Sequence, residues 1–165
     1  KSGAIVIGAR EFLIAYNVYL STTDKELAHR IAGVIRESGC LATADDGRKI
    51  RIPGMFRSVK AVGISPGEPG VAEVSVNLTN YGVAPMHLVF EKIKQLGQLA
   101  AASVLYSEIV GLIPREAILD AGRFYQPGAR SEKKLIEAAV KNVRLDSPQG
   151  FDPGAKIIEY MIGTP

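Results

Sequence analysis

The sequence is poor in the residues that build disulfide frameworks, zinc clusters and membrane spans. Its 165 residues include one cysteine, Cys40, and no tryptophan. A single cysteine cannot form an internal disulfide and offers no pair for a zinc site, so we expect a reducing compartment. The longest apolar stretches, at residues 12–20 and 99–106, fall short of the ~20 residues that cross a bilayer, and no basic-then-apolar leader precedes them. These absences predict a soluble, cytoplasmic protein with no membrane partner.

Charge and motif content exclude further classes of protein. Lys and Arg number 20 against 17 Asp and Glu, and the resulting charge of +3 is too small to predict a nucleic-acid partner. A Walker-type motif is absent, so P-loop enzymes have no support. Residues 63–67 have the G-x-S-x-G spacing, but they join two predicted strands and not a strand to a helix, so serine hydrolases have no support either. His29 and His87 lie in expected helices without further ligands at metal-binding spacing, so we predict surface or packing roles for both and no metal ion.

The overall composition of the chain is that of one globular domain. Apolar residues make up 47% of the chain and charged residues 22%, which is close to the average for soluble domains. The length also matches a single domain. Because the chain begins at Lys1 and not at methionine, we expect a fragment or a processed chain.

Hydrophobic periodicity predicts the order of the elements. Short β-rich runs predict strands at residues 12–20, 59–64, 71–80 and 103–113. Apolar residues at helical spacing predict helices at residues 24–38, 85–101, 114–121 and 131–143. Thr23 and Glu26 have the spacing of a capping box at the start of the first helix. We interpret residues 40–58 as a long surface loop, and we expect a short strand at 157–161 in an otherwise loop-like tail.

The order over the first 113 residues is β-α-β-β-α-β, the split βαβ pattern of ferredoxin-like folds. We therefore predict an α+β fold, with an antiparallel sheet and helices on one face over about residues 10–113 and a C-terminal helical extension over about 114–165. The other face of the sheet is then left for a ligand, a partner or water. Successive side chains alternate across a strand, so the face away from the helices displays polar residues: Glu73, Ser75, Asn77 and Thr79.

Five residues are candidates for binding at or near this face. Asn17 interrupts an otherwise apolar strand, where an unpaired amide costs ~1–3 kcal/mol, so it needs a structural partner or a ligand. Asn77 is expected on the same face. Arg10 follows a glycine-containing turn and can bind a carboxylate bidentately. Arg57 and Lys60 lie close to the strand at 59–64 and can attract carboxylates or phosphates.

Plainer interpretations stay open for these residues. Arg10 can be a solvated side chain in a tight entry turn, and Asn77 can be an ordinary polar residue of a half-exposed strand. The polar face has no obvious proton-transfer group unless Glu73 or Glu108 reaches into it.

Four motifs in the chain together resemble one protein family. They are G-A-R-E-F-L-I-A-Y-N-V-Y-L, V-S-V-N-L-T-N-Y, P-M-H-L-V-F-E and S-E-I-V-G-L-I-P. In this order they are similar to the C-terminal subdomain of the formiminotransferase domain, which occurs in glutamate formimidoyltransferases and formimidoyltransferase-cyclodeaminases. The resemblance continues to I-I-E-Y near the end, so it covers almost all of residues 1–165.

The resemblance implies a reaction and a partner. In this family two ferredoxin-like subdomains hold tetrahydrofolate between them, and the formimino group of N-formimino-L-glutamate is moved to N5 of the folate during histidine degradation. The family's general-base histidine lies in the preceding subdomain, so the resemblance implies no catalytic residue here, and neither His29 nor His87 takes that role. Catalysis would require the N-terminal subdomain, on the same or a companion chain.

Under this resemblance the candidate residues acquire expected roles. Asn17 and Asn77 would bond the pterin or the substrate, and Arg10, Arg57 and Lys60 would neutralise glutamyl carboxylates. Tetrahydrofolate would be a co-substrate, and we expect a homo-oligomer.

Two other classes of function remain open from the sequence. An RNA-binding module has the same order of elements, but such modules stack bases on aromatic residues of their first and third strands. Here Tyr16 and Tyr19 lie in the first strand, whereas the strand at 71–80 has no aromatic residue. The third reading is a non-catalytic dimerisation or regulatory domain that uses its bare sheet face as an interface.

Overall fold

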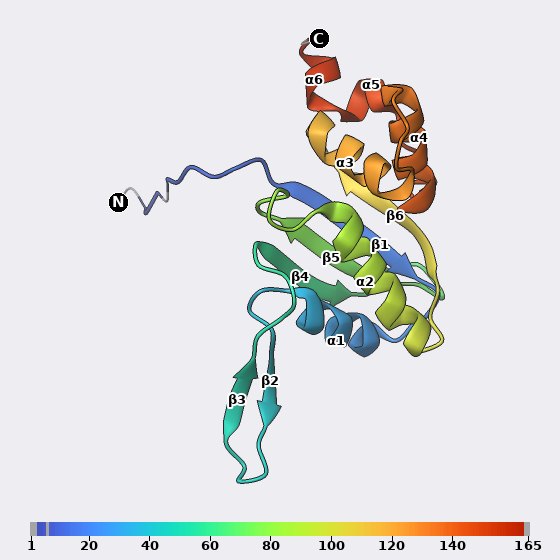
Figure 1. Cartoon of the computed structure of the whole chain (residues 1–165). Coiled ribbons are helices and arrows are strands. Elements are labelled where there is room, and N and C mark those ends of the chain that lie inside the picture. The colour runs from blue at the N-terminus through green and yellow to red at the C-terminus, as the bar shows by residue number, and fades with distance from the viewer. Residues whose placement is uncertain (1–2, 6, 164–165) are drawn as a thin grey trace.

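The computed structural model describes residues 3–5 and 7–163, and its main sheet is antiparallel throughout (Figure 1). Its strands, in spatial order, are β4 (Val59–Ile64), β5 (Ala72–Leu78), β1 (Ile14–Leu20) and β6 (Val104–Val110). Helices α1 (Lys25–Ile35) and α2 (Met86–Leu99) lie on one face of this sheet. The predicted ferredoxin-like βαββαβ arrangement is therefore confirmed, with β5 and β1 as the central pair.

Strand β1 forms because its sequence is apolar on the face that meets the helices. Ile14, Tyr16, Val18 and Leu20 are each 0% exposed, and the residues between them are half-buried. Phe12 is 61% exposed and lies outside the strand, so β1 starts later than its apolar run. The alternation leaves the odd-numbered side chains on the face away from the helices.

The start of α1 differs from the predicted capping box. Asp24 is the N-cap, and its Oδ1 accepts a hydrogen bond from the backbone N–H of Leu27 at 2.9 Å. The prediction that Thr23 and Glu26 form the cap is wrong by one residue, because a carboxylate at Asp24 satisfies the same free N–H groups and its charge suits the positive end of the helix.

Residues 40–58 are not a plain loop, and this prediction is wrong. They contain a second, two-stranded sheet of β2 (Cys40–Thr43) and β3 (Lys49–Ile52), which projects from the body of the protein beside α1 (Figure 1). Gly47 has a φ of +82° in the turn between the strands, and the Arg48 side chain donates to the carboxylate of Asp46. Apolar residues alternate with charged ones only on β3, which is four residues long, and the surrounding charges and turn formers favoured the interpretation as a loop.

The described part of the C-terminal region is mainly helical. Helices α3 (Arg115–Tyr125) and α4 (Glu132–Asn142) are followed by two short helices, α5 (Pro153–Lys156) and α6 (Ile158–Met161). The expected strand at 157–161 is wrong, because only Ile157 forms a β-bridge, with Ile113, before α6 begins. Helix α3 also runs past the predicted end at residue 121.

The C-terminal helices are tied to the sheet through its β6 edge. The hydroxyl groups of Tyr16 and Ser107 both donate to the carbonyl of Val143, just after α4. The backbone N–H of Ser107 donates to the carbonyl of Arg144 at 2.6 Å, so the chain after α4 covers the free edge of β6. None of the helices within residues 3–5 and 7–163 has the length and apolar character needed to cross a membrane.

Candidate ligand-binding face of the sheet

The face of the sheet away from α1 and α2 is built from three rows of side chains. Residues directly opposite each other in antiparallel strands point to the same face, so the strand register defines each row. The first row is Lys60, Asn77, Ala15 and Val110; the second is Val62, Ser75, Asn17 and Glu108; the third is Ile64, Glu73, Tyr19 and Tyr106. We call this surface the open face, and its centre is polar.

Asn17 lies at the middle of the open face, between Ser75 and Glu108 on the flanking strands. The Ser75 hydroxyl donates to Oδ1 of Asn17 at 2.9 Å. This bond satisfies the amide oxygen and orients the side chain, so the amino group of Asn17 is presented as a donor. The structure thus supplies one structural partner for Asn17 and still leaves it a group with which to bind a ligand.

Asn77 and Lys60 are neighbours in the first row. They sit directly opposite each other on β5 and β4, and Lys60 is exposed. Lys60 forms no ion pair with any other residue of the described ranges. Thr79, which was expected on the same face, instead donates its hydroxyl to the carbonyl of Ser58 at 3.0 Å and so anchors the start of β4.

The two arginine candidates lie outside the rows. Arg57 is exposed in the turn that precedes β4, close to Lys60 in the chain. Arg10 is exposed in the segment before β1, which extends away from the sheet (Figure 1). The structure therefore brings Asn17, Asn77 and Lys60 together on one face and places Arg57 and Arg10 at greater separation from its centre.

The open face also holds acidic and aromatic groups that the sequence analysis did not assign to a site. The rings of Tyr19 and Tyr106 stack with centroids 4.4 Å apart, and the Tyr19 hydroxyl donates to Oε2 of Glu108 at 3.2 Å. Glu73 lies opposite Tyr19 and is only 4% exposed. Alternation along residues 103–113 would have placed Tyr106 and Glu108 on the same side, had it been applied to that strand.

These groups shift one another's proton affinity. Burial, followed by the negative charge of Glu73, raises the pKa of Tyr19 from 10.0 to about 12. Burial also raises the pKa of the Glu73 carboxyl, and the nearby charge of Glu108 acts in the same direction. The tyrosine is therefore a neutral hydrogen-bond donor near neutral pH.

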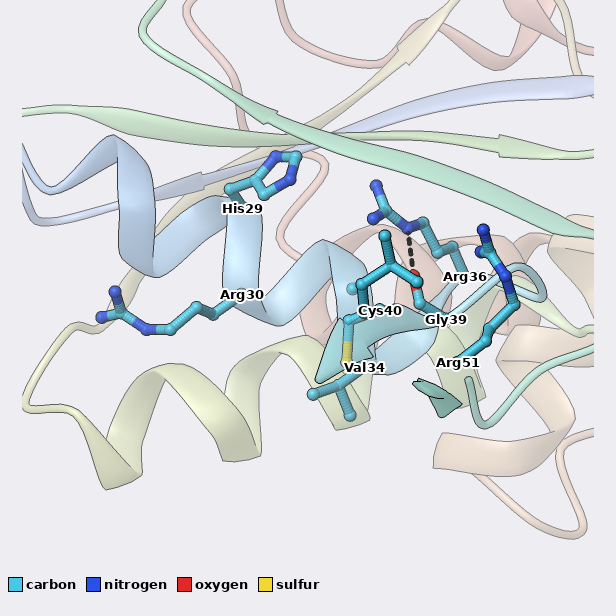
Figure 2. Close-up of a pocket in the computed structure, with 9 residues that line it drawn as sticks. His29, Arg30, Val34, Arg36, Gly39, Cys40 and Arg51 are labelled. Atoms are coloured by element: carbon cyan, nitrogen blue, oxygen red, sulfur yellow. Dashed lines mark hydrogen bonds between the residues drawn. The ribbon is translucent and has the colours of Figure 1, made fainter. Parts of the chain in front are cut away.

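A separate open pocket of about 640 Å³ lies between α1 and the β2–β3 hairpin (Figure 2). It is basic, but its guanidinium groups already have partners. Arg36 donates to the carbonyls of Gly39 and Ala61, and Arg51 donates to the carbonyl of Ser38. Arg30 forms an ion pair with Asp24 at 3.4 Å. Arg36 and Arg51 therefore hold the base of the hairpin against α1, whereas Arg30 pairs with the N-cap of its own helix.

The two histidines occupy different environments. His29 is exposed on α1, at the edge of this pocket. His87 is 5% exposed on α2 and stacks on Phe124 with ring centroids 4.6 Å apart, and burial lowers its pKa. Neither lies on the open face. Within residues 3–5 and 7–163, no three His, Cys, Asp or Glu side chains are grouped so that they could hold a metal ion.

Comparison with known proteins finds a family that covers most of the chain. The sequence profile of the formiminotransferase domain family matches residues 15–163. Formimidoyltransferase-cyclodeaminase of Gallus gallus is 40% identical over 164 residues, which is 97% of this chain and 29% of that protein. Glutamate formimidoyltransferase of Thermoplasma acidophilum is 34% identical over 145 residues, which is 84% of this chain and 43% of that protein. The chain therefore spans less than half the length of each of these relatives.

Proposed function

This chain belongs to the formiminotransferase domain family, and from that premise we propose that it is the folate-binding C-terminal half of a glutamate formimidoyltransferase. Tetrahydrofolate would lie against the open face as co-substrate, and the preceding subdomain would close over it. The core and the helical extension together would make up this one subdomain. Its expected location is the cytoplasm, and its expected assembly a homo-oligomer.

The observation that carries this proposal is the polar centre of a sheet face on which neither α1 nor α2 packs. Asn17, Ser75 and Asn77 lie on the adjacent central strands β1 and β5, and all three are half-buried. An amide side chain carries both donors and an acceptor, as do the ring and amide edges of a pterin. A flat surface with fixed amides can therefore orient a flat heterocycle.

In this reaction the C-terminal half is needed to orient the two reactants more than to transfer protons. The lone pair of N5 attacks the amidine carbon of N-formimino-L-glutamate, a C–N bond forms, and the C–N bond to the glutamate nitrogen breaks. The proton lost from N5 passes to a base, and the leaving nitrogen of glutamate takes up a proton. Holding the two reactants in line contributes about 7–11 kcal/mol to such reactions in favourable cases.

The five candidate residues take the roles that this geometry allows. Asn17 and Asn77 would bond the pterin or the substrate at the centre of the face. Lys60, opposite Asn77, would neutralise a glutamyl carboxylate, with Arg57 beside it and Arg10 supplied by the segment before β1. The general base would come from the N-terminal subdomain, so this chain acts as an enzyme only in combination with it.

Folinate, a stable N5-substituted folate, provides the direct test of the site. We expect folinate to bind the chain when the preceding half of a relative's formiminotransferase domain is supplied in trans, as measured by calorimetry. Asn17→Ala and Asn77→Ala should each weaken this binding by roughly fivefold to tenfold, because one hydrogen bond to a ligand contributes about 1 kcal/mol or slightly more. Formimino transfer is followed in a separate mixture, in which tetrahydrofolate and N-formimino-L-glutamate replace folinate, by mass spectrometry of the folate product.

Gln98→Ala is the matched control, because Gln98 is a polar, exposed residue on α2, away from the open face. It should leave folinate binding unchanged. Equal affinity in the wild type and both asparagine variants would contradict the proposed folate face. Single-stranded RNA that bound with higher affinity than folinate would favour the RNA-binding alternative instead.

A further inference from the structure

The pocket between α1 and the β2–β3 hairpin carries positive charge that no acidic side chain of the described residues neutralises. Its lining includes His29, Arg30, Arg36 and Arg51, and none of the described residues that line it is acidic. Arg30 pairs with Asp24 outside the pocket. Neither Arg36 nor Arg51 forms an ion pair with any residue of the described ranges. Two guanidinium groups therefore line this cavity without a counter-charge.

Backbone carbonyls hold these two guanidinium groups in place and leave their charge unbalanced. Nε of Arg36 donates to the carbonyl of Gly39 at 2.7 Å, and Nη1 of Arg51 donates to the carbonyl of Ser38 at 2.7 Å. Nη1 of Arg36 also donates to the carbonyl of Ala61 at 3.3 Å. Consecutive residues are ~3.8 Å apart along the chain, so bonds to Ser38 and Gly39 bring the two positive groups to the same end of the pocket (Figure 2).

Close backbone contacts fix the wall of the pocket at the base of the hairpin. A Cβ added at Gly39 would lie 1.8 Å from the carbonyl oxygen of Ile52. A Cβ added at Gly54 would lie 1.8 Å from the carbonyl oxygen of Arg36. The two ends of the hairpin are therefore packed tightly against each other and against the end of α1. A site formed in advance loses less conformational entropy when a ligand binds.

We propose that this pocket binds a small organic anion through carboxylate or phosphate oxygens that contact Arg36 and Arg51. A guanidinium group has more N–H donors than the carbonyl bonds use, which are two from Arg36 and one from Arg51. The remaining donors suit an oxyanion, which accepts two parallel hydrogen bonds from one guanidinium group. The volume of about 640 Å³ is typical of small-molecule sites.

Apolar side chains of the pocket indicate that the anion has a hydrocarbon body. Val34 of α1 and Leu41 of β2 are exposed and line the same cavity as the arginines. Their burial by a ligand would add hydrophobic stabilisation that an inorganic ion cannot supply. The open face is the sheet face away from α1, whereas this pocket lies beside α1. The anion site is therefore separate from the proposed folate face.

Cys40 allows the charge of the pocket to be measured, because it lines the cavity and is the one cysteine of the chain. Its alkylation by iodoacetate and by iodoacetamide, which differ mainly in charge, is followed by mass spectrometry. Positive charge in the pocket concentrates the anionic reagent. Relative to a neutral cysteine amide in solution, we expect Cys40 to favour iodoacetate several-fold at low salt and to lose this preference as ionic strength rises.

Succinate and phenyl phosphate distinguish the two kinds of oxyanion. Each is titrated against the rate at which iodoacetamide alkylates Cys40, with succinamide as the neutral isostere and sodium chloride at equal ionic strength. We expect saturable protection by at least one of the anions and none by succinamide or chloride. Protection by succinate alone identifies a carboxylate site, and protection by phenyl phosphate alone identifies a phosphate site. Arg51→Gln should weaken the protection roughly tenfold, because a charged hydrogen-bond donor is lost.

Arg48→Gln is the matched control, because Arg48 belongs to the same hairpin, pairs with Asp46 and does not line the pocket. It removes the same charge and should leave the protection as it is in the wild type. If Arg51→Gln fails to fold, the titrations of the wild-type chain against succinamide and chloride still decide the question. Failure of both anions to protect Cys40 would overturn the proposal.

Equal protection in Arg51→Gln and Arg48→Gln would also overturn it. Folinate binding, measured with the preceding subdomain in trans, tests whether the two sites are separate. We expect Arg51→Gln to bind folinate as the wild type does while it loses protection by the anion. A loss of folinate binding in Arg51→Gln would contradict a site separate from the open face.

Discussion

At the scale of the residue, two polar side chains lie in central strands that are otherwise mainly apolar. Asn17 and Glu73 lie on neighbouring central strands and both face away from α1 and α2. Asn17 accepts a hydrogen bond from Ser75, and the pKa of the Glu73 carboxyl is raised by burial. A hydrogen-bonded amide is compatible with a structural role alone, and the amino group of Asn17 is the donor that a ligand would use.

His87 gives a residue-scale prediction about pH. Burial lowers its pKa below the ordinary 6.5, although Asp120 and Glu91 act in the opposite direction. The folded chain therefore keeps His87 neutral where the unfolded chain takes up a proton. This contribution to stability is present above pH 6.5 and is lost as the pH falls through 6.5 towards the lowered value. Urea midpoints measured between about pH 7.5 and pH 5.5 should decrease.

Two substitutions test the origin of that decrease. His87→Phe keeps an aromatic ring against Phe124 and removes the titrating group, so it should reduce the loss of stability over this range. His29→Gln changes the exposed histidine of α1 and should leave the pH dependence as it is in the wild type. An identical pH dependence in His87→Phe and wild type would show that His87 is not responsible.

At the scale of the element, close backbone contact between a strand and a helix sets the shape of the sheet. A Cβ added at Gly63 of β4 would lie 2.1 Å from the backbone nitrogen of His29 and 2.3 Å from the carbonyl carbon of Ala28. Only glycine allows α1 to approach β4 this closely. This contact positions β4, and therefore Lys60, at the edge of the open face.

Gly63→Ala is accordingly predicted to destabilise the fold. The added methyl group must push α1 away from β4, so the free energy of unfolding should fall by about 1–3 kcal/mol, measured by urea denaturation. Gly8→Ala is the matched control, since nothing lies within 4 Å of a Cβ at that position. A Gly63→Ala protein as stable as Gly8→Ala would mean that α1 and β4 can separate without cost.

At the scale of the whole molecule, the C-terminal helices complete the core of the sheet. The carbonyl of Val143 accepts hydrogen bonds from Tyr16 and Ser107, which are both 0% exposed. Lys156 also donates to the carbonyl of Ile109 at 2.9 Å. The βαββαβ sheet is therefore stabilised by residues that follow it in the chain.

We predict that the whole molecule unfolds in a single transition. Far-ultraviolet circular dichroism and tyrosine fluorescence should give the same urea midpoint, because the sheet, α3 and α4 share one core. A chain that ends after residue 113 loses the partners of Tyr16 and Ser107 and should fail to unfold cooperatively. Two separate midpoints in the full chain, or a truncated chain with unchanged stability, would contradict this view.

The sequence predicted the main sheet well because its signals are local. A continuous apolar run at residues 12–20 and alternation along residues 71–80 identified the central strands, Asn17 and Asn77 were expected on one face, and Pro85 marked the start of α2. The β2–β3 hairpin was missed because its apolar residues are few and stand among charges. The strand expected at residues 157–161 was wrong for a different reason. Its one β-bridge joins Ile157 to Ile113, which is far away in the chain.

By itself the sequence determined the βαββαβ order, the family resemblance and the polar character of one sheet face, since each depends on residue types at short spacing. Only the tertiary structure decided which side chains meet on that face. The strand register sets Asn17 between Ser75 and Glu108 and sets Tyr19 between Glu73 and Tyr106. Contacts between residues far apart in the chain leave no periodic trace in the sequence, so these neighbours became visible only when the strands were placed side by side.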